Sequence, residues 1–152
     1  FLICTLIGLT MRSLKLGLVS LAPNILPTLV AFGLWGLWKG QIDIGSSIVA
    51  VIAFGIIVDD TIHFLHRYQH FRQQGEDYQG AVRKTFAAVG MALMTTTIVL
   101  VLGFGVLGVS DFTLNSSMGL LTSLTIALAL VVDFIFLPAL LGVVDSQKTA
   151  RP

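Results

Sequence analysis

Long apolar segments separated by short polar connections restrict this chain to very few architectures. Four segments, 16–38, 45–65, 86–109 and 116–144, each reach the length of about 20 residues that an α-helix needs to cross ~30 Å of hydrocarbon. Hydrocarbon offers the backbone no hydrogen-bond partners, so a spanning segment must satisfy its own amide groups, as a helix does. The sequence therefore predicts an all-α fold, a polytopic bundle of transmembrane helices.

The composition excludes an ordinary soluble domain. Charged residues make up 11% of the chain and hydrophobic residues 55%, whereas about a quarter of the residues of a soluble domain are charged. A net charge of +1 and the lack of a basic patch with interleaved aromatic residues argue against a nucleic-acid partner. Cys4 is the single cysteine, so the chain forms neither an intramolecular disulfide nor a cysteine-based metal cluster.

The remaining segments predict how the spans are connected. Residues 1–10 are apolar but too short to span, and the chain begins with Phe1, so we interpret them as the end of a truncated helix in a piece of a longer protein. Residues 66–85 are mostly polar and form a cytoplasmic connection. The spacing of apolar residues from Asp77 onward favours a short helix that lies at the membrane surface and leads into the next span.

The basic residues predict the orientation of the bundle. With four spans, eight of the nine basic residues fall on one side and only Lys39 on the other. The eight are Arg12, Lys15, Arg67, Arg72, Arg83, Lys84, Lys148 and Arg151. Because lysine and arginine accumulate in cytoplasmic loops, this side and the C-terminus are expected to be cytoplasmic.

Two adjacent acids, Asp59 and Asp60, lie within the second span. Asp59 follows Gly45 by fourteen residues, about 21 Å at the helical rise, which is inside the hydrocarbon core. A charge at that depth costs several kcal/mol, so such residues commonly belong to an ion or proton pathway. Alternatively the two acids lie at the interface and merely end the helix, but the apolar residues 62, 64 and 65 that follow weigh against this.

Several residues are candidates to support a proton relay at these acids. Gly55 and His63 lie one turn before and after Asp59 on the same helix face, and the glycine leaves room for a neighbouring helix. Thr95, Thr96 and Thr97 lie at a similar depth in the third span, where their hydroxyl groups could donate to a carboxylate. Burial and a neighbouring carboxylate both favour the protonated acid, as a proton carrier requires.

Other charged residues leave alternatives open. Asp133 lies deep in the last span, where it either pairs with a basic residue of the inner loops or serves the pathway as a second intramembrane acid. Asp59, His63 and His66 could chelate a metal by spacing, but no third ligand on another span accompanies them, so no metal site is predicted. An intramembrane aspartyl hydrolase would require Asp59 and Asp133 to face one water.

The motifs resemble those of one superfamily of permeases. Gly55-x-x-x-Asp59-Asp60-Thr61-Ile62-His63-Phe64-Leu65 resembles the GxxxDD-type motif of the resistance-nodulation-division superfamily, in its MMPL-type, hydrophobe-exporter branch, which is related to Patched-like and sterol-sensing-domain proteins. The other matching elements are Pro23-Asn24-x-x-Pro27, Thr95-Thr96-Thr97, Gly103-Phe104 and Asp133-x-x-x-x-Pro138-Ala139-Leu140-Leu141. They occur in order along nearly the whole chain.

The resemblance implies a part of a larger transporter rather than an enzyme. The chain would supply the last helices of a twelve-helix permease that exports lipids or other hydrophobic molecules from the bacterial inner membrane by proton antiport. Asp59 and Asp60 would belong to the proton relay, and no cofactor is implied. The expected partners are membrane lipids, the N-terminal half of the permease and the hydrophobic substrate; sodium coupling and a homo-oligomer remain open. The alternative is a lipid-sensing membrane module without transport.

Overall fold

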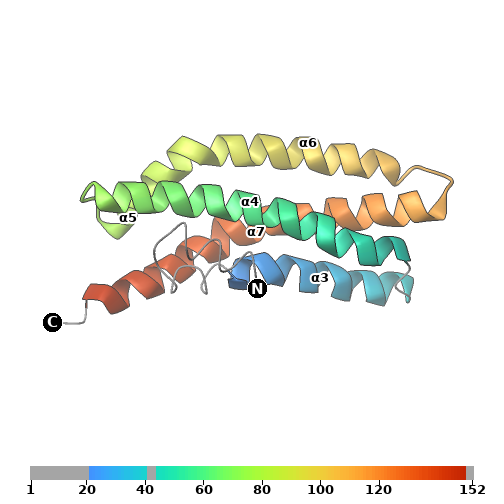
Figure 1. The fold of residues 1–152 in the computed structure, drawn as a ribbon, viewed down its shortest axis with the longest axis horizontal. Coiled ribbons are helices and arrows are strands. Elements are labelled where there is room, and N and C mark those ends of the chain that lie inside the picture. Colours follow the sequence, from blue (N-terminus) through green and yellow to red (C-terminus); the bar gives the residue numbers. More distant parts are fainter. Residues whose placement is uncertain (1–20, 41–43, 150–152) are drawn as a thin grey trace.

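The computed structural model describes residues 21–40 and 44–149 as a bundle of helices (Figure 1). The elements in chain order are α3 (Leu21–Lys39), α4 (Ile44–Gln73), α5 (Tyr78–Thr85), the π-helical turn η1 (Phe86–Gly90), α6 (Met91–Leu107) and α7 (Thr113–Thr149). These ranges contain no strand, which confirms the predicted all-α class. The predicted helix at 1–10 and the first residues of the segment 16–38 lie outside the described part of the chain.

Most of the predicted connection 66–85 is helical. Helix α4 runs on to Gln73 because Leu65 and Tyr68 are buried in the bundle and extend its packed face. Gly75, with a φ of +91°, adopts the left-handed conformation that commonly follows a helix end. Asp77 then caps α5, its side chain accepting a hydrogen bond from the Gly80 amide. Helix α5 leads through η1 into α6 without an interruption in the helical backbone.

Helix α7 is the common neighbour of the other spans. It packs against α3, α4 and α6, and Figure 1 shows α6 and α3 on opposite sides of α4 and α7. One apolar core joins α3, α4 and α7 around Trp35, Ile57 and Leu121. A second core lies toward α5 and contains Phe64, Tyr68, Leu93, Leu137 and Leu141, with Phe86 and Phe134 packed on its edge.

Small residues bring α6 and α7 close together. A Cβ atom on Gly119 would lie 2.5 Å from the carbonyl oxygen of Phe104 and 2.6 Å from the Cβ of Leu107. The hydroxyl groups of Ser116 and Ser123 donate to the carbonyl oxygens of Gly108 and Val101 across the same contact, at 2.9 and 3.0 Å. Close approach at small residues, with hydroxyl groups bonding across the contact, is typical of helix packing inside a bilayer.

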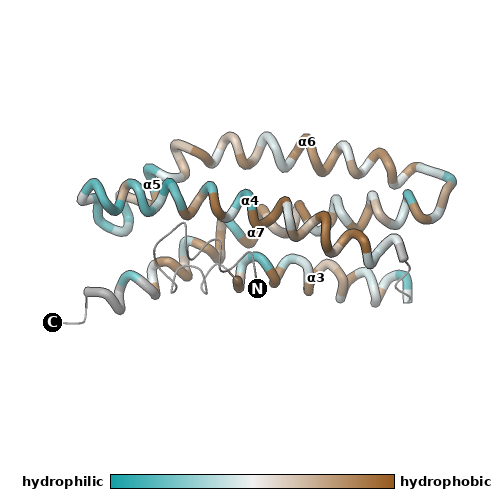
Figure 2. Tube along the Cα trace, viewed as in Figure 1, coloured by the Kyte–Doolittle hydropathy of each residue, from teal (hydrophilic) through white to brown (hydrophobic). Residues whose placement is uncertain are grey.

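Four helical segments are long and apolar enough to cross a membrane: Leu21–Lys39, Gly45–Gln73, Tyr78–Leu107 and Thr113–Val143. Large apolar side chains such as Leu29, Val51, Val99, Val106 and Ile135 remain exposed on them, as lipid contact allows. Figure 2 shows hydrophilic residues gathered on α5 and the adjoining end of α4. The described part of the chain is therefore a multi-pass membrane bundle.

Candidate functional site: two groups of polar residues on α4

The predicted acidic pair lies in the second half of α4, which is 30 residues long and so extends about 45 Å. Successive residues of an α-helix point about 100° apart. Asp59 is exposed, Asp60 is partly buried, and Thr61 is completely buried. One turn of α4 thus carries polar side chains from an open face into the interior of the bundle.

The open face of α4 consists of Gly55, Asp59 and His63. The side chains of Asp59 and His63 are 72% and 67% exposed, and Nε2 of His63 lies 3.7 Å from Oδ1 of Asp59. Apart from the adjoining backbone of α4 itself, nothing lies within 4 Å of the position that a Cβ on Gly55 would occupy. Burial of both acids by protein is the expectation from the sequence. The described helices leave Asp59 uncovered, because they pack against the opposite face of α4. Ile57, Thr61 and Phe64 are among the residues of that buried face.

A second polar group lies inside the bundle and joins three helices. Asn24 of α3, Thr61 of α4 and Asp133 of α7 are 2%, 0% and 3% exposed. The Thr61 Oγ1 atom lies 2.7 Å from Oδ1 of Asn24 and 3.2 and 3.5 Å from the two carboxylate oxygens of Asp133. It also lies 3.1 Å from the carbonyl oxygen of Ile57 on its own helix. We call these three residues the interior cluster.

Asp133 therefore has the hydroxyl group of Thr61 as its neighbour instead of a basic side chain. Within residues 21–40 and 44–149, no ion pair includes Asp133, while Arg72 pairs with Asp145 at 2.7 Å and Lys84 with Glu76. Of the two alternatives left open for Asp133, pairing with a basic residue of the inner loops is thus not found among the described residues. Asp59 is exposed where Asp133 is buried, which also speaks against a hydrolase in which both acids face one water.

The three threonines of α6 do not contact the acids as the depth match suggested. The hydroxyl groups of Thr95 and Thr96 are exposed and donate to carbonyl oxygens of their own helix, those of Met91 and Ala92, at 2.9 and 3.0 Å. Thr97 is 3% exposed, and its hydroxyl group has no hydrogen-bond partner among the described residues. Depth along a span can be read from sequence, but the direction of a side chain around the helix cannot.

Sequence reasoning did not assign a role to Asn24 or Thr61. Both appeared only as letters within longer motifs, Asn24 between two prolines and Thr61 directly after the acids. The sequence feature that could have identified them is that each is a small polar residue within a long apolar segment. Such side chains often form hydrogen bonds between helices. The described ranges contain no group of three or more His, Cys, Asp or Glu side chains that could hold a metal.

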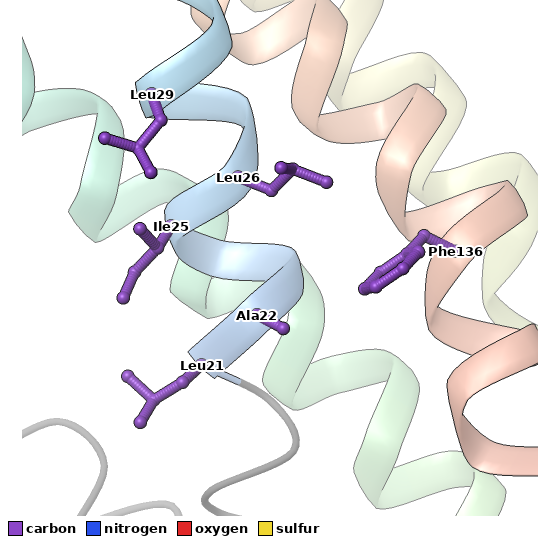
Figure 3. A pocket seen from close by; sticks show the side chains of 6 residues that line it. All are labelled: Leu21, Ala22, Ile25, Leu26, Leu29 and Phe136. Atoms are coloured by element: carbon purple, nitrogen blue, oxygen red, sulfur yellow. The ribbon is translucent and has the colours of Figure 1, made fainter. Parts of the chain in front are cut away.

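An apolar groove lies beside the start of α3. It has a volume of about 420 Å³ and is lined by Leu21, Ala22, Ile25, Leu26 and Leu29 of α3 together with Phe136 of α7. Figure 3 shows the aromatic ring of Phe136 facing Leu26 of α3, while Leu21, Ile25 and Leu29 extend away from Phe136 in this view. Its lining is that of a lipid-facing surface and contains no polar side chain.

Comparison with known proteins identifies relatives along the whole chain. The sequence model of the MMPL family matches residues 1–152. A membrane protein of Methanocaldococcus jannaschii is 30% identical over 128 residues, which cover 82% of this chain and 33% of the relative. The chain thus spans about a third of the length of this curated relative. No solved structure matches.

Proposed function

Because the chain belongs to the MMPL family, we propose that it forms part of the membrane domain of a proton-driven exporter of lipids or other hydrophobic molecules, with Asp59 and Asp60 in the proton relay. This is the function implied by the resemblance of Gly55, Asp59 and Asp60 to the GxxxDD-type motif of the resistance-nodulation-division superfamily. It involves transport across a cytoplasmic membrane and no enzymatic step. The C-terminus would lie in the cytoplasm, on the side where the basic residues gather.

The open face of α4 is the observation that carries this proposal. A carboxylate exposed to lipid tails at this depth is costly, so intramembrane acids face other helices or a water-filled cavity. The described helices do not cover Asp59, and the relative is about three times as long as the aligned segment. The N-terminal half of the same permease is the natural cover, and Gly55 allows a helix of that half to approach closely.

The chemistry available on this face is proton binding. Each carboxylate accepts one proton, and two adjacent acids discourage each other's ionisation. Water that reaches the face would solvate a charged carboxylate there, and Nε2 of His63 lies 3.7 Å from Oδ1 of Asp59. When the partner helices close over it, the neutral acid is favoured because burial of a charge is costly. A proton taken up in one state and released in the other would couple helix movement to the proton gradient.

The alternative function is a lipid-sensing membrane module without transport. The apolar groove between α3 and α7 favours it, because an acyl chain fits a lining of this kind. The two functions differ in their dependence on protons. A sensor responds to lipid with a conformational change that is indifferent to the proton gradient, whereas an exporter stops when the gradient is removed.

The full-length protein in proteoliposomes provides the test. Asp59→Asn combined with Asp60→Asn should abolish proton-driven export of a fluorescent lipid while insertion and abundance stay normal. Asp111→Asn, in the exposed turn between α6 and α7, is the matched control and should export at the wild-type rate. Export that survives the double substitution would refute the relay, and a lipid-dependent conformational change without any export would support the sensing module.

A further inference from the structure

In the interior cluster, the hydroxyl group of Thr61 is surrounded by more hydrogen-bond acceptor oxygens than its one hydrogen can satisfy. The Thr61 hydroxyl group has a single hydrogen. Its oxygen lies within hydrogen-bonding distance of three other residues' oxygens, those of Asn24, Asp133 and Ile57. The shortest contact, 2.7 Å to Oδ1 of Asn24, uses the hydrogen of Thr61. An ionised Asp133 would then face the Thr61 oxygen at 3.2 Å with no hydrogen between them.

One additional proton resolves this conflict. If Asp133 is protonated, it donates to the Thr61 oxygen, and Thr61 donates to Asn24, so that each contact contains one hydrogen. We propose that Asn24, Thr61 and Asp133 form a second proton-binding site, inside the bundle and apart from the open face, with Asp133 as the proton carrier. This inference rests on the proposed function, because it extends the relay from the open face into the interior.

The ionised state has its own arrangement. A half-turn of the Asn24 amide group presents its NH₂ group to the Thr61 oxygen, and the Thr61 hydroxyl group then donates to the carboxylate. Loss of the proton therefore reverses the direction of both hydrogen bonds and requires only a side-chain rotation. The hydroxyl group in the middle acts as donor to α3 in one state and to α7 in the other.

The surroundings favour the neutral acid. Helix α3 contains one charged residue, Lys39 at its last position, and α6 contains none. On α4, Asp60 directly precedes Thr61 in the chain, and its charge has the same sign as that of an ionised Asp133. Helix α5 approaches α7 through Tyr78, whose hydroxyl group donates to the carbonyl oxygen of Pro138. No cation among the described residues compensates a charge on Asp133, and burial of an uncompensated charge is costly.

Asp60 connects this site with the open face. It follows Asp59 and precedes Thr61 on α4, and it is partly buried. A proton that enters at Asp59 can therefore be passed to the side of α4 on which α3 and α7 pack. The hydrogen bonds between these three helices would then change with each proton transferred.

Difference infrared spectroscopy of the full-length protein in proteoliposomes tests the site, because a protonated carboxyl group has its own C=O stretching band. A pH step should produce a band that Asp133→Asn removes. Thr61→Val, which keeps the side-chain shape, should shift the band to higher frequency, and Thr61→Ser should restore it. A band unaffected by either Asp133→Asn or Thr61→Val would overturn the proposal, as would a carboxylate signal for Asp133 at every pH.

The same measurement distinguishes a proton from sodium. Spectra recorded in choline and in sodium buffer should titrate at the same pH if the site binds a proton alone. A titration that moves with sodium concentration would contradict the proposal and indicate a sodium site made of the same oxygens.

The infrared spectrum and the export assay together separate the interior site from the relay at the open face. In the background of Asp59→Asn with Asp60→Asn, an Asp133 band that persists alongside undiminished export would refute the relay at the open face and leave the interior site standing. Export that depends on Asp59 and Asp60, without any Asp133 band, would refute the interior site alone.

Discussion

The hydroxyl group of Thr61 on α4 lies 3.2 Å from a carboxylate oxygen of Asp133 on α7, although 72 positions separate the two residues in the chain. Asn24 of α3 bonds to the same hydroxyl group, so one side chain of α4 connects three helices. A hydrogen bond between helices in a bilayer contributes on average about 0.6 kcal/mol and up to ~1.7 kcal/mol.

Loss of this hydroxyl group should therefore weaken the bundle modestly. Thr61→Val is expected to lower the free energy of unfolding by about 1–2 kcal/mol, because it leaves Asn24 and Asp133 without their common partner. Thr61→Ser should stay within about 0.5–1.5 kcal/mol of the wild type, the range of losing a methyl group. Unfolding of the full-length protein in detergent and denaturant measures both, and a Thr61→Val variant as stable as the wild type would show that the hydroxyl group contributes nothing.

The contact between α6 and α7 should tolerate no side chain at Gly119. Gly119→Ala places a methyl group 2.5 Å from the Phe104 carbonyl oxygen and forces the helices apart, which is expected to cost about 1–3 kcal/mol. Gly103→Ala on α6 is the matched control, since its Cβ meets nothing within 4 Å. The control should be neutral or slightly stabilising, because alanine favours a helix by roughly 1 kcal/mol over glycine. Thermal stability in detergent compares the two; an equal effect of both substitutions would contradict the close contact.

A bulky side chain on the open face of α4 should prevent docking of the other half of the permease. Gly55→Leu in the full-length protein is expected to abolish export while membrane insertion stays normal, because the leucine would occupy the space that the proposed partner helix needs. Gly33→Leu on α3 is the control, since both glycines have open space around the Cβ position in the described bundle. Unchanged export by the Gly55 variant would indicate that this face meets only lipid or water.

A tyrosine side chain of α5 makes a hydrogen bond to the backbone of α7. The hydroxyl group of Tyr78 donates to the Pro138 carbonyl oxygen at 2.7 Å, and its ring lies against Gly142. Tyr78→Phe keeps the ring and removes a bond of about 0.5–1.5 kcal/mol. Amide hydrogen exchange in α5 should accelerate by roughly 2–10-fold on this basis, whereas Gln79→Ala, at an exposed position, should leave it unchanged. The contact would be unimportant if Tyr78→Phe exchanged at the wild-type rate.

The spans and their order could be predicted from the sequence because long runs of apolar residues can be recognised along the chain. The side of each helix that faces the interior could not be predicted in the same way. Helix α6 is apolar all round, so its sequence gives no period that distinguishes lipid from protein. For that reason Thr95, Thr96 and Thr97 were treated alike, although only Thr97 is buried.

Whether Asp59 and Asp60 are covered by other helices could not be predicted from the sequence either. The spacing correctly places Gly55, Asp59 and His63 on one face of α4, since helix geometry requires it. Whether a face is covered depends on other parts of the structure, and the described helices leave this one open. The interior cluster depends on contacts between residues 37 and 72 positions apart, which no local pattern reveals.

The π-helical turn Phe86–Gly90 determines which side of α6 faces the interior of the bundle. A π turn contains one residue more than an α turn, so α6 is rotated by about 100° relative to an uninterrupted continuation of α5. This rotation turns Leu93 and Thr97, rather than their sequence neighbours, toward the interior. A one-residue deletion within Phe86–Gly90 would therefore preserve the contacts of both flanking helices, while the same deletion inside α6 would turn its outer half toward lipid.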